Sequence, residues 1–422
     1  MARHKTIPEL RKFTGKCPRC SLCKFPPLTV VENQRFSTIC PSYDEYKFHS
    51  HSGGGRIVMA MSLEEGRCEV TEEMRDAIFQ CTLCGGCDMA CKYSSDIEIL
   101  DTLYALRAES FQRKGPLPAH QQVLDRMDEV GHPIYQEGSK ADWIKEAGLA
   151  RQEGGDFLLY VGCRYALLPE RRKSLLNLAR LLHKAGYEFS ALGEAEPCCG
   201  RMALDIGDQE RFNRMASATI EAVRRTGVKK VVCADAECYS TFRAHFPKVA
   251  ESGVTVLHPV ELLADAVKKR KLKFKTKFSR RVAYHDPCNL GRLSETYKPW
   301  DGEIKKVLGQ LIVYDPPRPV NRGTNGCYDP PRRLLDAIPG IGRVEFHRCR
   351  EYSYCCGGAG VAYPAFPAFS DNTALERMTE AKAVGAEVVV TACPNCVSNL
   401  KSAQDRTGVE VMDIYDLLAQ AL

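Results

Sequence analysis

The 422-residue chain has no apolar run long enough to cross a membrane as a helix. A membrane span needs about 20 apolar residues, and the longest apolar stretch, FLLYVGCRYALLP, is interrupted by Gly162, Cys163 and Arg164. The first residues, MARHKTIPELRKF, lack the apolar segment of a secretory signal. These absences predict a cytoplasmic protein and leave open an association with the membrane through a partner.

A dinucleotide-binding fingerprint is also missing. The glycines of GGG at 53–55 do not stand between a strand and a helix, so we predict a loop there and no nucleotide site. No flavin motif is found along the chain. Two-electron chemistry would therefore need a partner or an unusual metal centre.

Cysteine, in contrast, is plentiful, with 21 residues among 422. A reducing compartment disfavours disulfides, so metal binding is the expected use of these thiols. The formal charge of +6 counts every thiol as neutral, and two four-iron centres, each held by four thiolates, would lower it to about +2. The basic charge is thus weak evidence for an acidic partner, and we expect no nucleic acid to bind.

Three segments follow one another along the chain. Residues 1–150 contain nine cysteines and helix-like stretches such as EEMRDAIFQC, and they end in a polar stretch, YQEGSKADW to RQEGGD, that is typical of a linker. Residues 151–280 and 281–422 alternate strands with helices, for example DFLLYVGC before PERRKSLLNLARLLHKAG. This alternation predicts parallel sheets covered by helices. The expected fold class is α/β with an N-terminal all-α domain.

The two α/β segments are copies of one another. Each has a cysteine after a strand, then a CCG motif (PCCGRMA or YCCGGAG), a long helix, and a strand that ends near another cysteine. Between Cys199 and Asp235 lie 35 residues, and between Cys356 and Cys393 lie 36, which indicates a duplication. The second copy carries an insertion of roughly 30 residues, YKPWDGEIKKVLGQLIVYDPPRPVNRGTNG, whose Pro and Gly content predicts a surface excursion.

The N-terminal cysteines form two groups of three plus one. CPRCSLCK has the spacing C-x2-C-x2-C, and CTLCGGCDMACK has C-x2-C-x2-C-x3-C. In a two-cluster ferredoxin the fourth cysteine of such a run binds the other cluster. The spacing therefore assigns one [4Fe–4S] cubane to Cys17, Cys20, Cys23 and Cys91, and the second to Cys81, Cys84, Cys87 and Cys40. Zinc is disfavoured because it prefers four ligands from two short pairs.

The second α/β copy offers five thiols, two of them adjacent: Cys288, Cys355, Cys356, Cys393 and Cys396. Adjacent side chains diverge, so the set suits an opened [4Fe–4S] cluster with one bridging thiolate. AEVVVTACPNC places CxxC where a strand ends and a helix begins, so helix N–H groups would face an anionic centre. Structural zinc would leave one thiol unused. His285, three residues before Cys288, is either a donor to this site or a structural residue.

The first copy departs from this pattern. It has Cys163, Cys198, Cys199 and Cys238, but Asp235 stands where the second copy has a thiol. A carboxylate binds iron–sulfur cores less well than a thiolate does. Three outcomes remain open: an empty structural site, a zinc site, or a cluster with one weakly held iron. Cys233 lies on the same face of the strand and would substitute if the strand end shifted. We expect an empty or structural site here.

The motifs YHDPCNLGR, YCCGGAG and TACPNC, in two CCG copies that follow a ferredoxin-like segment, resemble the D-type heterodisulfide reductases and other CCG-domain iron–sulfur oxidoreductases. Iron–sulfur subunits of glycolate oxidase, the CCG subunit of a sulfate-reducer membrane complex and electron-transfer subunits of benzoyl-CoA reductase share the arrangement. The resemblance covers nearly the whole chain. It implies that CCG thiols bind non-cubane [4Fe–4S] clusters, at which true heterodisulfide reductases cleave a disulfide in one-electron steps.

The sequence thus predicts an oxidoreductase subunit in which two cubanes exchange electrons with one non-cubane centre in the second CCG copy. The alternative is a pure electron-transfer subunit that links a flavoprotein to a larger complex, of the benzoyl-CoA reductase type or linked to quinone. The expected partners are other redox subunits, either flavoprotein or iron–sulfur, a quinone-linked membrane subunit, and a disulfide or another small redox substrate. A zinc-stabilised interaction protein is disfavoured by the ferredoxin-type spacing.

Overall fold

The computed structural model describes residues 5–92, 95, 97–148, 154–246, 253–295, 300, 302–309, 311–317 and 319–422. Within them, residues before 149 form helices and turns, and later residues form parallel sheets covered by helices. Among the described residues, no helix is both long enough and apolar enough to cross a bilayer. The mixture of helices and parallel sheet confirms that the fold is α/β.

The N-terminal part is built on the long helix α6, against which α1, α3, α4 and α5 pack. Aliphatic and aromatic side chains, among them Leu10, Leu63, Phe79 and Leu106, form its core. Such residues recur at helical spacing, which explains why helices form here. The helices are α1 (Ile7–Thr14), α2 (Pro41–Tyr46), α3 (Gly53–Glu64), α4 (Glu72–Phe79), α5 (Gly86–Lys92), α6 (Ile99–Lys114), α7 (Pro118–Val130) and α8 (Asp142–Glu146).

The first repeat contains a four-stranded parallel sheet in the order β2-β1-β3-β4. Every residue of β1 is buried, as expected for a strand covered by helices on both faces. Its elements are β1 (Phe157–Tyr160), α9 (Cys163–Leu167), α10 (Pro169–Lys184), β2 (Phe189–Ser190), α11 (Arg201–Ile206), α12 (Gln209–Arg225), β3 (Lys230–Cys233), α13 (Ala236–Ser240), a π-helical turn (Thr241–His245), β4 (Thr255–Leu257) and α15 (Pro259–Lys268).

The second repeat contains another four-stranded parallel sheet, in the order β10-β9-β5-β8. Its central strand β9 is also fully buried. Its elements are β5 (Arg281–Tyr284), α16 (Asp329–Asp336), β8 (Gly342–Val344), α17 (Ala362–Ala365), α18 (Pro367–Ala383), β9 (Val388–Thr391), α19 (Pro394–Lys401), α20 (Gln404–Thr407), β10 (Glu410–Asp413) and α21 (Ile414–Gln420).

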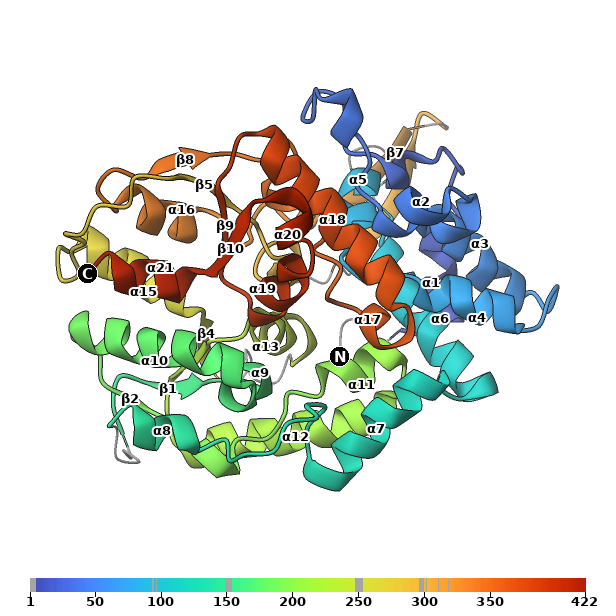
Figure 1. Ribbon diagram of the computed structural model, residues 1–422. Helices are drawn as coiled ribbons and strands as arrows, with labels where there is room; N and C mark the ends of the chain where they lie inside the picture. The colour runs from blue at the N-terminus through green and yellow to red at the C-terminus, as the bar shows by residue number, and fades with distance from the viewer. Residues whose placement is uncertain are drawn as a thin grey trace.

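The two sheets have the same topology. When the strands of each repeat are numbered from its own start, both sheets have the order 2-1-3-4. The packing between the repeats is reciprocal, because α10 of the first contacts α21 of the second, and α15 of the first contacts α16 of the second. Helices α10 and α16 each follow the first strand of their repeat, and α15 and α21 each follow the last. The repeats therefore face each other across an approximate two-fold axis, with α10 and α21 side by side in Figure 1.

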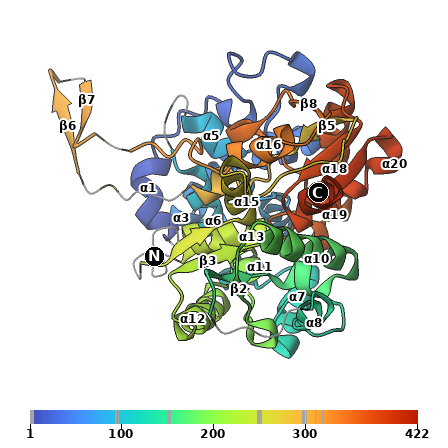
Figure 2. The same cartoon turned by 90° about the vertical axis from the view of Figure 1, so that its left-hand side faces the viewer.

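The insertion in the second repeat forms an antiparallel hairpin of β6 (Glu303–Val307) and β7 (Leu311–Asp315). Figure 2 shows it projecting from the body of the molecule. Its turn residue Leu308 is 94% exposed. For the hairpin the expected surface excursion is confirmed, whereas Asn321 and Gly323, later in the insertion, are buried.

Two predictions for the N-terminal part are wrong. The glycines at 53–55 begin helix α3 and do not form a loop, because Ser52 caps the helix by accepting a hydrogen bond from the Gly55 N–H. The polar stretch expected to be a linker contains α8, whose Trp143 is 1% exposed and packs in the main core. Residues 149–153 of that stretch lie outside the described residues, as does the boundary proposed at residue 150.

Candidate metal centres

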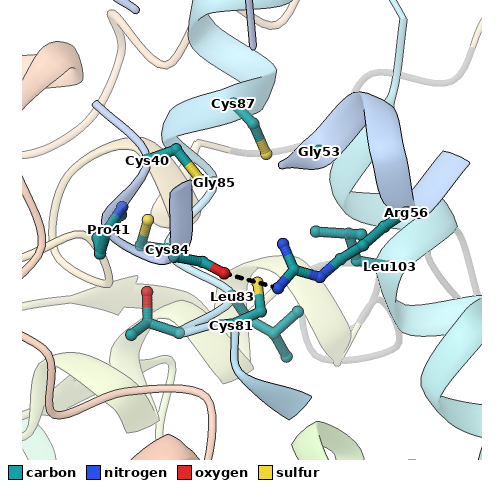
Figure 3. A pocket seen from close by; sticks show the side chains of 12 residues that line it. Cys40, Pro41, Gly53, Arg56, Cys81, Leu83, Cys84, Gly85, Cys87 and Leu103 are labelled. Carbon is teal, nitrogen blue, oxygen red and sulfur yellow. Dashed lines mark hydrogen bonds between the residues drawn. The ribbon is translucent and has the colours of Figure 1, made fainter. Parts of the chain in front are cut away.

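The N-terminal thiols gather in two places. One cavity is lined by Cys17, Cys20, Cys23 and Cys91, which we name the first cysteine set. A second cavity is lined by Cys40, Cys81, Cys84 and Cys87, the second cysteine set. In Figure 3 the sulfur atoms of the second set surround one space, with the Arg56 guanidinium at its edge. Each set thus draws its fourth member from a distant part of the chain, in the same combinations as the spacing predicts.

Helix α3 begins between these two sets. The Gly54 N–H donates a hydrogen bond to Cys23 Sγ at 3.2 Å. A Cβ added at Gly53 would lie 2.9 Å from the Cβ of Cys87, closer than side chains approach one another. Only glycine lets the helix N-terminus come this near to both sets, and the positive end of the helix dipole then faces them.

Three buried arginines surround the second cysteine set. Arg107 donates to the carbonyl of Cys81 at 2.6 Å, and Arg292 donates to the carbonyl of Cys84 at 2.5 Å. Arg56 donates in the same way to backbone carbonyls at the C-terminal end of α4, the helix that precedes Cys81. Each of the three is at most 3% exposed, and within the described residues no carboxylate pairs with them. Burial lowers the pKa of Arg107, as expected for a cation without a counter-ion.

These features fit an iron–sulfur cluster at the second cysteine set. Buried cations need an anion nearby, and a four-iron centre with four thiolate ligands carries about two negative charges. Without such a centre, burial raises the pKa of Cys40 to about 12. The donors are all thiols, which are soft ligands suited to iron–sulfur cores.

The five thiols of the second repeat, Cys288, Cys355, Cys356, Cys393 and Cys396, also come together, and we name them the repeat-two set. The neighbouring thiols of Cys288 and Cys356 raise the pKa of Cys355, and burial with the neighbouring thiols of Cys356 and Cys393 raises the pKa of Cys396. All five are buried. The loop after β5, the CCG loop and the start of α19 carry them, all at the carboxyl ends of parallel strands, where α/β proteins place their sites.

The second cysteine set touches the repeat-two set. The nearby thiol of Cys355 lowers the pKa of Cys84, although 270 residues separate the two in the chain. Arg292 joins the same two loops, because it donates to the carbonyl of Cys84 and also to the carbonyl of Ser353 at 2.6 Å. The two sets therefore lie close enough for electrons to pass between them.

His285 faces the repeat-two set with a defined tautomer. Its Nδ1 accepts a hydrogen bond from Arg377 Nε at 3.1 Å, and arginine can only donate. The ring proton therefore lies on Nε2, which is buried without a hydrogen-bond partner among the described residues. A ring nitrogen lies within 4.8 Å of the sulfur atoms of Cys356 and Cys396. Burial lowers the pKa of His285. The ring is thus neutral beside these thiols, and Arg377 leaves it no free lone pair with which to bind a metal ion.

The first repeat holds its residues differently. The neighbouring thiol of Cys198 raises the pKa of Cys163, and Cys199 Sγ lies 3.5 Å from Cys238 Sγ. Asp235 does not point a free carboxylate at these thiols, because it caps α13 by accepting a hydrogen bond from the Glu237 N–H at 2.8 Å. Burial and the neighbouring Glu237 raise the pKa of Asp235 to about 7.

Another carboxylate is buried in the first repeat. Glu196 accepts hydrogen bonds from the backbone N–H groups of Val161 and Gly162 at 2.9 and 2.8 Å. In the second repeat, Ser353 occupies the equivalent position, two residues before the CCG cysteines, and His285 occupies that of Tyr160. The first repeat therefore has the Asp235 carboxylate where the second repeat has a thiol, and it also has the buried carboxylate of Glu196.

The two sites lie beside each other across the approximate two-fold axis. Asn395 of the second repeat donates to Glu237 Oε1 of the first at 3.0 Å, and these two residues are equivalent in the two copies. Arg164, next to Cys163, lies 3.6 Å from Glu237. Near them opens a cavity of about 620 Å³, lined by both repeats and by α7.

The sequence did not identify the residues around the thiols. Gly53, Gly54 and the buried arginines have no spacing that marks them, since an arginine that binds carbonyls looks like a surface arginine in a sequence. The Ser-Gly-Gly-Gly signal of a capped helix start was present and was overlooked. Of the remaining cysteines, Cys233 and Cys327 are buried, whereas Cys68 and Cys349 are half-buried.

Comparisons with known proteins match this layout. Residues 14–95 match the 4Fe-4S dicluster domain, and residues 157–243 and 320–401 match the Cysteine-rich domain named CCG. The chain is 29% identical to the D-type subunit of the dihydromethanophenazine:CoB–CoM heterodisulfide reductase from Methanosarcina mazei, over 96% of this chain and 93% of that protein. It is 24% identical to the EtfAB:quinone oxidoreductase of Syntrophomonas wolfei, over 96% of this chain and 58% of that protein.

A solved structure supports the fold alone. The crystal structure of a hypothetical protein from Helicobacter pylori aligns with a TM-score of 0.50 and 9% identity, over 88% of this chain and 67% of that one. Together, the dicluster match, the two CCG matches and the similarity to heterodisulfide reductases along nearly the whole chain identify the family. The chain belongs to the CCG-domain iron–sulfur oxidoreductases.

Proposed function

We propose that this chain conducts electrons through two cubane [4Fe–4S] clusters, at the first and second cysteine sets, to a non-cubane [4Fe–4S] cluster at the repeat-two set, where a disulfide-type substrate is reduced. When bound, such clusters accept and release single electrons. The first-repeat residues Cys163, Cys198, Cys199, Cys238 and Asp235 hold no cluster in this proposal. The cytoplasmic location and the domain boundaries at residues 150 and 280 stay predictions.

The closeness of Cys84 to Cys355, whose loops Arg292 joins, carries the proposal. It makes the repeat-two set the natural end of a path that begins at the first cysteine set, where Cys20 is exposed. An exposed thiol at that end suits electron entry from a partner redox subunit. At the other end the thiols are buried, and the cavity of about 620 Å³ lies beside the loops that carry them.

The reaction at the repeat-two set is a two-electron reduction, RSSR + 2e⁻ + 2H⁺ → 2 RSH. The two electrons arrive one at a time from an external reductant, and the S–S bond of the substrate breaks. In this step His285 donates a hydrogen bond and does not supply the proton, because Arg377 fixes its tautomer and burial keeps the ring neutral. The protons come from water through the cavity.

An alternative is supported by the similarity to the EtfAB:quinone oxidoreductase. In that case the chain is a pure relay that passes electrons between a flavoprotein and a quinone-linked membrane partner, and the repeat-two cluster meets no substrate.

Anaerobic protein separates these possibilities. Iron is counted, EPR spectra are recorded with and without a small thiol, and reduction of a small disulfide is followed with a reduced viologen dye as donor. The proposal expects about 12 Fe per chain, a new paramagnetic signal with thiol, and dye-coupled disulfide reduction. About 12 Fe with neither of the other two results would favour the relay. About 8 Fe would mean that the repeat-two set holds no cluster.

A further inference from the structure

The cavity beside the repeat-two set has the size of a small-molecule site, which is typically several hundred Å³. Gly358, two residues after Cys356, and Asn395, between Cys393 and Cys396, form part of its lining. The loops that carry the thiols are therefore also walls of the cavity. Ser398 Oγ is buried in the same wall and has no hydrogen-bond partner among the described residues, so it is available to a ligand.

The charged groups of the cavity are mostly carboxylates. Arg164 is the one cation among its described lining residues, and it already faces Glu237 at 3.6 Å. Asp205 is paired with Arg201 at 2.8 Å, outside the cavity lining. The lining therefore offers no unpaired positive charge to an incoming molecule.

Two further carboxylates, Glu170 and Asp371, also line the cavity and form no ion pair within the described residues. Thiolate-bound clusters next to the cavity would add negative charge. A concave site lined by one sign of charge concentrates ligands of the opposite sign and repels ligands of the same sign.

From this charge pattern we infer that the substrate of the repeat-two site is a small disulfide without negative charge, neutral or cationic, and that the cavity excludes polyanionic disulfides. This inference rests on the proposed function. In this inference the carboxylates of Glu170 and Asp371 determine the charge of the accepted substrate, because Arg164 is neutralised by its ion pair.

Three disulfides of similar size and different charge test the inference: cystamine with two ammonium groups, 2-hydroxyethyl disulfide without charge, and 3,3′-dithiodipropionate with two carboxylates. With a reduced viologen dye as donor, we expect kcat/KM to be about tenfold higher for cystamine than for dithiodipropionate at low salt, with the neutral compound between them. The difference should narrow as salt screens the charges. Equal rates, or a preference for the dianion, would overturn the inference.

Substitutions of the lining carboxylates test whether these residues cause the preference for cystamine. Glu170→Gln together with Asp371→Asn should raise kcat/KM for dithiodipropionate and reduce the preference for cystamine several-fold. Glu221→Gln, which removes an exposed carboxylate of α12, is the matched control and should leave the preference unchanged. An unchanged preference in the double variant would place the selection elsewhere and contradict the assignment.

Failure of the proposed function gives a different result. If no disulfide is reduced and no thiol-induced EPR signal appears, the proposed catalysis is wrong. The cavity is then tested by calorimetric binding of the same three compounds to the iron-loaded chain. Cystamine binding tighter than dithiodipropionate would support the charge selection, and equal binding, no binding or the reverse order would overturn it.

Discussion

The two repeats share one topology and differ in what they keep at the carboxyl ends of their strands. Both sheets have the order 2-1-3-4, and both place a helix start over the site. In the second repeat that helix is capped by Cys393 without a side-chain hydrogen bond, whereas in the first it is capped by the Asp235 carboxylate. A residue at this position therefore either stabilises the helix or remains free to bind a metal.

The largest expected difference between the repeats is in bound iron. Cys356→Ser should lower the iron content from about 12 to about 8 per chain, because it removes a thiol of the repeat-two set. The matched variant Cys199→Ser, at the equivalent position of the first repeat, should leave about 12 Fe. Iron analysis and EPR of the cubane signals measure both. A loss of about four Fe in Cys199→Ser would show that the first repeat holds a cluster.

Asp235→Cys makes the first repeat more like the second. It restores the fifth thiol and should raise the iron content above about 12, toward about 16 per chain. It also removes the cap of α13, which costs about 1 kcal/mol of stability. Asp235→Asn keeps the cap without adding a thiol and should bind no additional iron. Unchanged iron in Asp235→Cys would mean that the buried Glu196 carboxylate also prevents binding.

Much of this comparison was predictable from the sequence, because ligand spacing and strand–helix alternation are local patterns. The grouping of Cys40 with Cys81 and of Cys91 with Cys17 follows from the motif alone, and the structure brings each group to one cavity. The contact between Cys84 and Cys355 was not predictable, since it depends on how the helical part packs on the second repeat. The capping role of Asp235 was missed because its alignment with a cysteine directed attention to metal binding.

The last helix of each repeat is capped by a titratable residue, and the contributions of these two residues to stability change with pH in opposite directions. His258 caps α15 in the first repeat, and burial lowers its pKa to about 3. Asp413 caps α21 in the second, and burial raises its pKa to about 7. In an unfolded chain these pKa values are about 6.5 and 3.9. The contribution of His258 to stability is therefore lost as pH falls below about 6.5, whereas that of Asp413 is lost as pH rises from about 4 to 7.

Asparagine caps helices without titrating, so it isolates each effect. His258→Asn should reduce the loss of stability on acidification from pH 7 to 5.5, by up to about 1.4 kcal/mol per pH unit. Asp413→Asn should be more stable than the unmodified chain at pH 8, with a difference that shrinks toward pH 5.5. Anaerobic calorimetry of the iron-loaded chain gives the melting temperatures. Parallel pH profiles for both variants and the unmodified chain would contradict these assignments.

The smallest effect concerns the position where the second repeat has His285 and the first has Tyr160. Reduction adds negative charge to the repeat-two centre, and an N–H donor beside Cys356 favours the reduced state. His285→Val removes the N–H donor and should keep the iron while lowering the reduction potential by some tens of mV, since a hydrogen bond to a charged group is worth about 1.5–3 kcal/mol and 59 mV corresponds to about 1.4 kcal/mol for one electron. His285→Gln retains an N–H donor and should recover part of the shift, as measured by redox titration followed by EPR. A merely structural histidine would give equal potentials in both variants, and a loss of iron only in His285→Val would indicate a role in holding the centre.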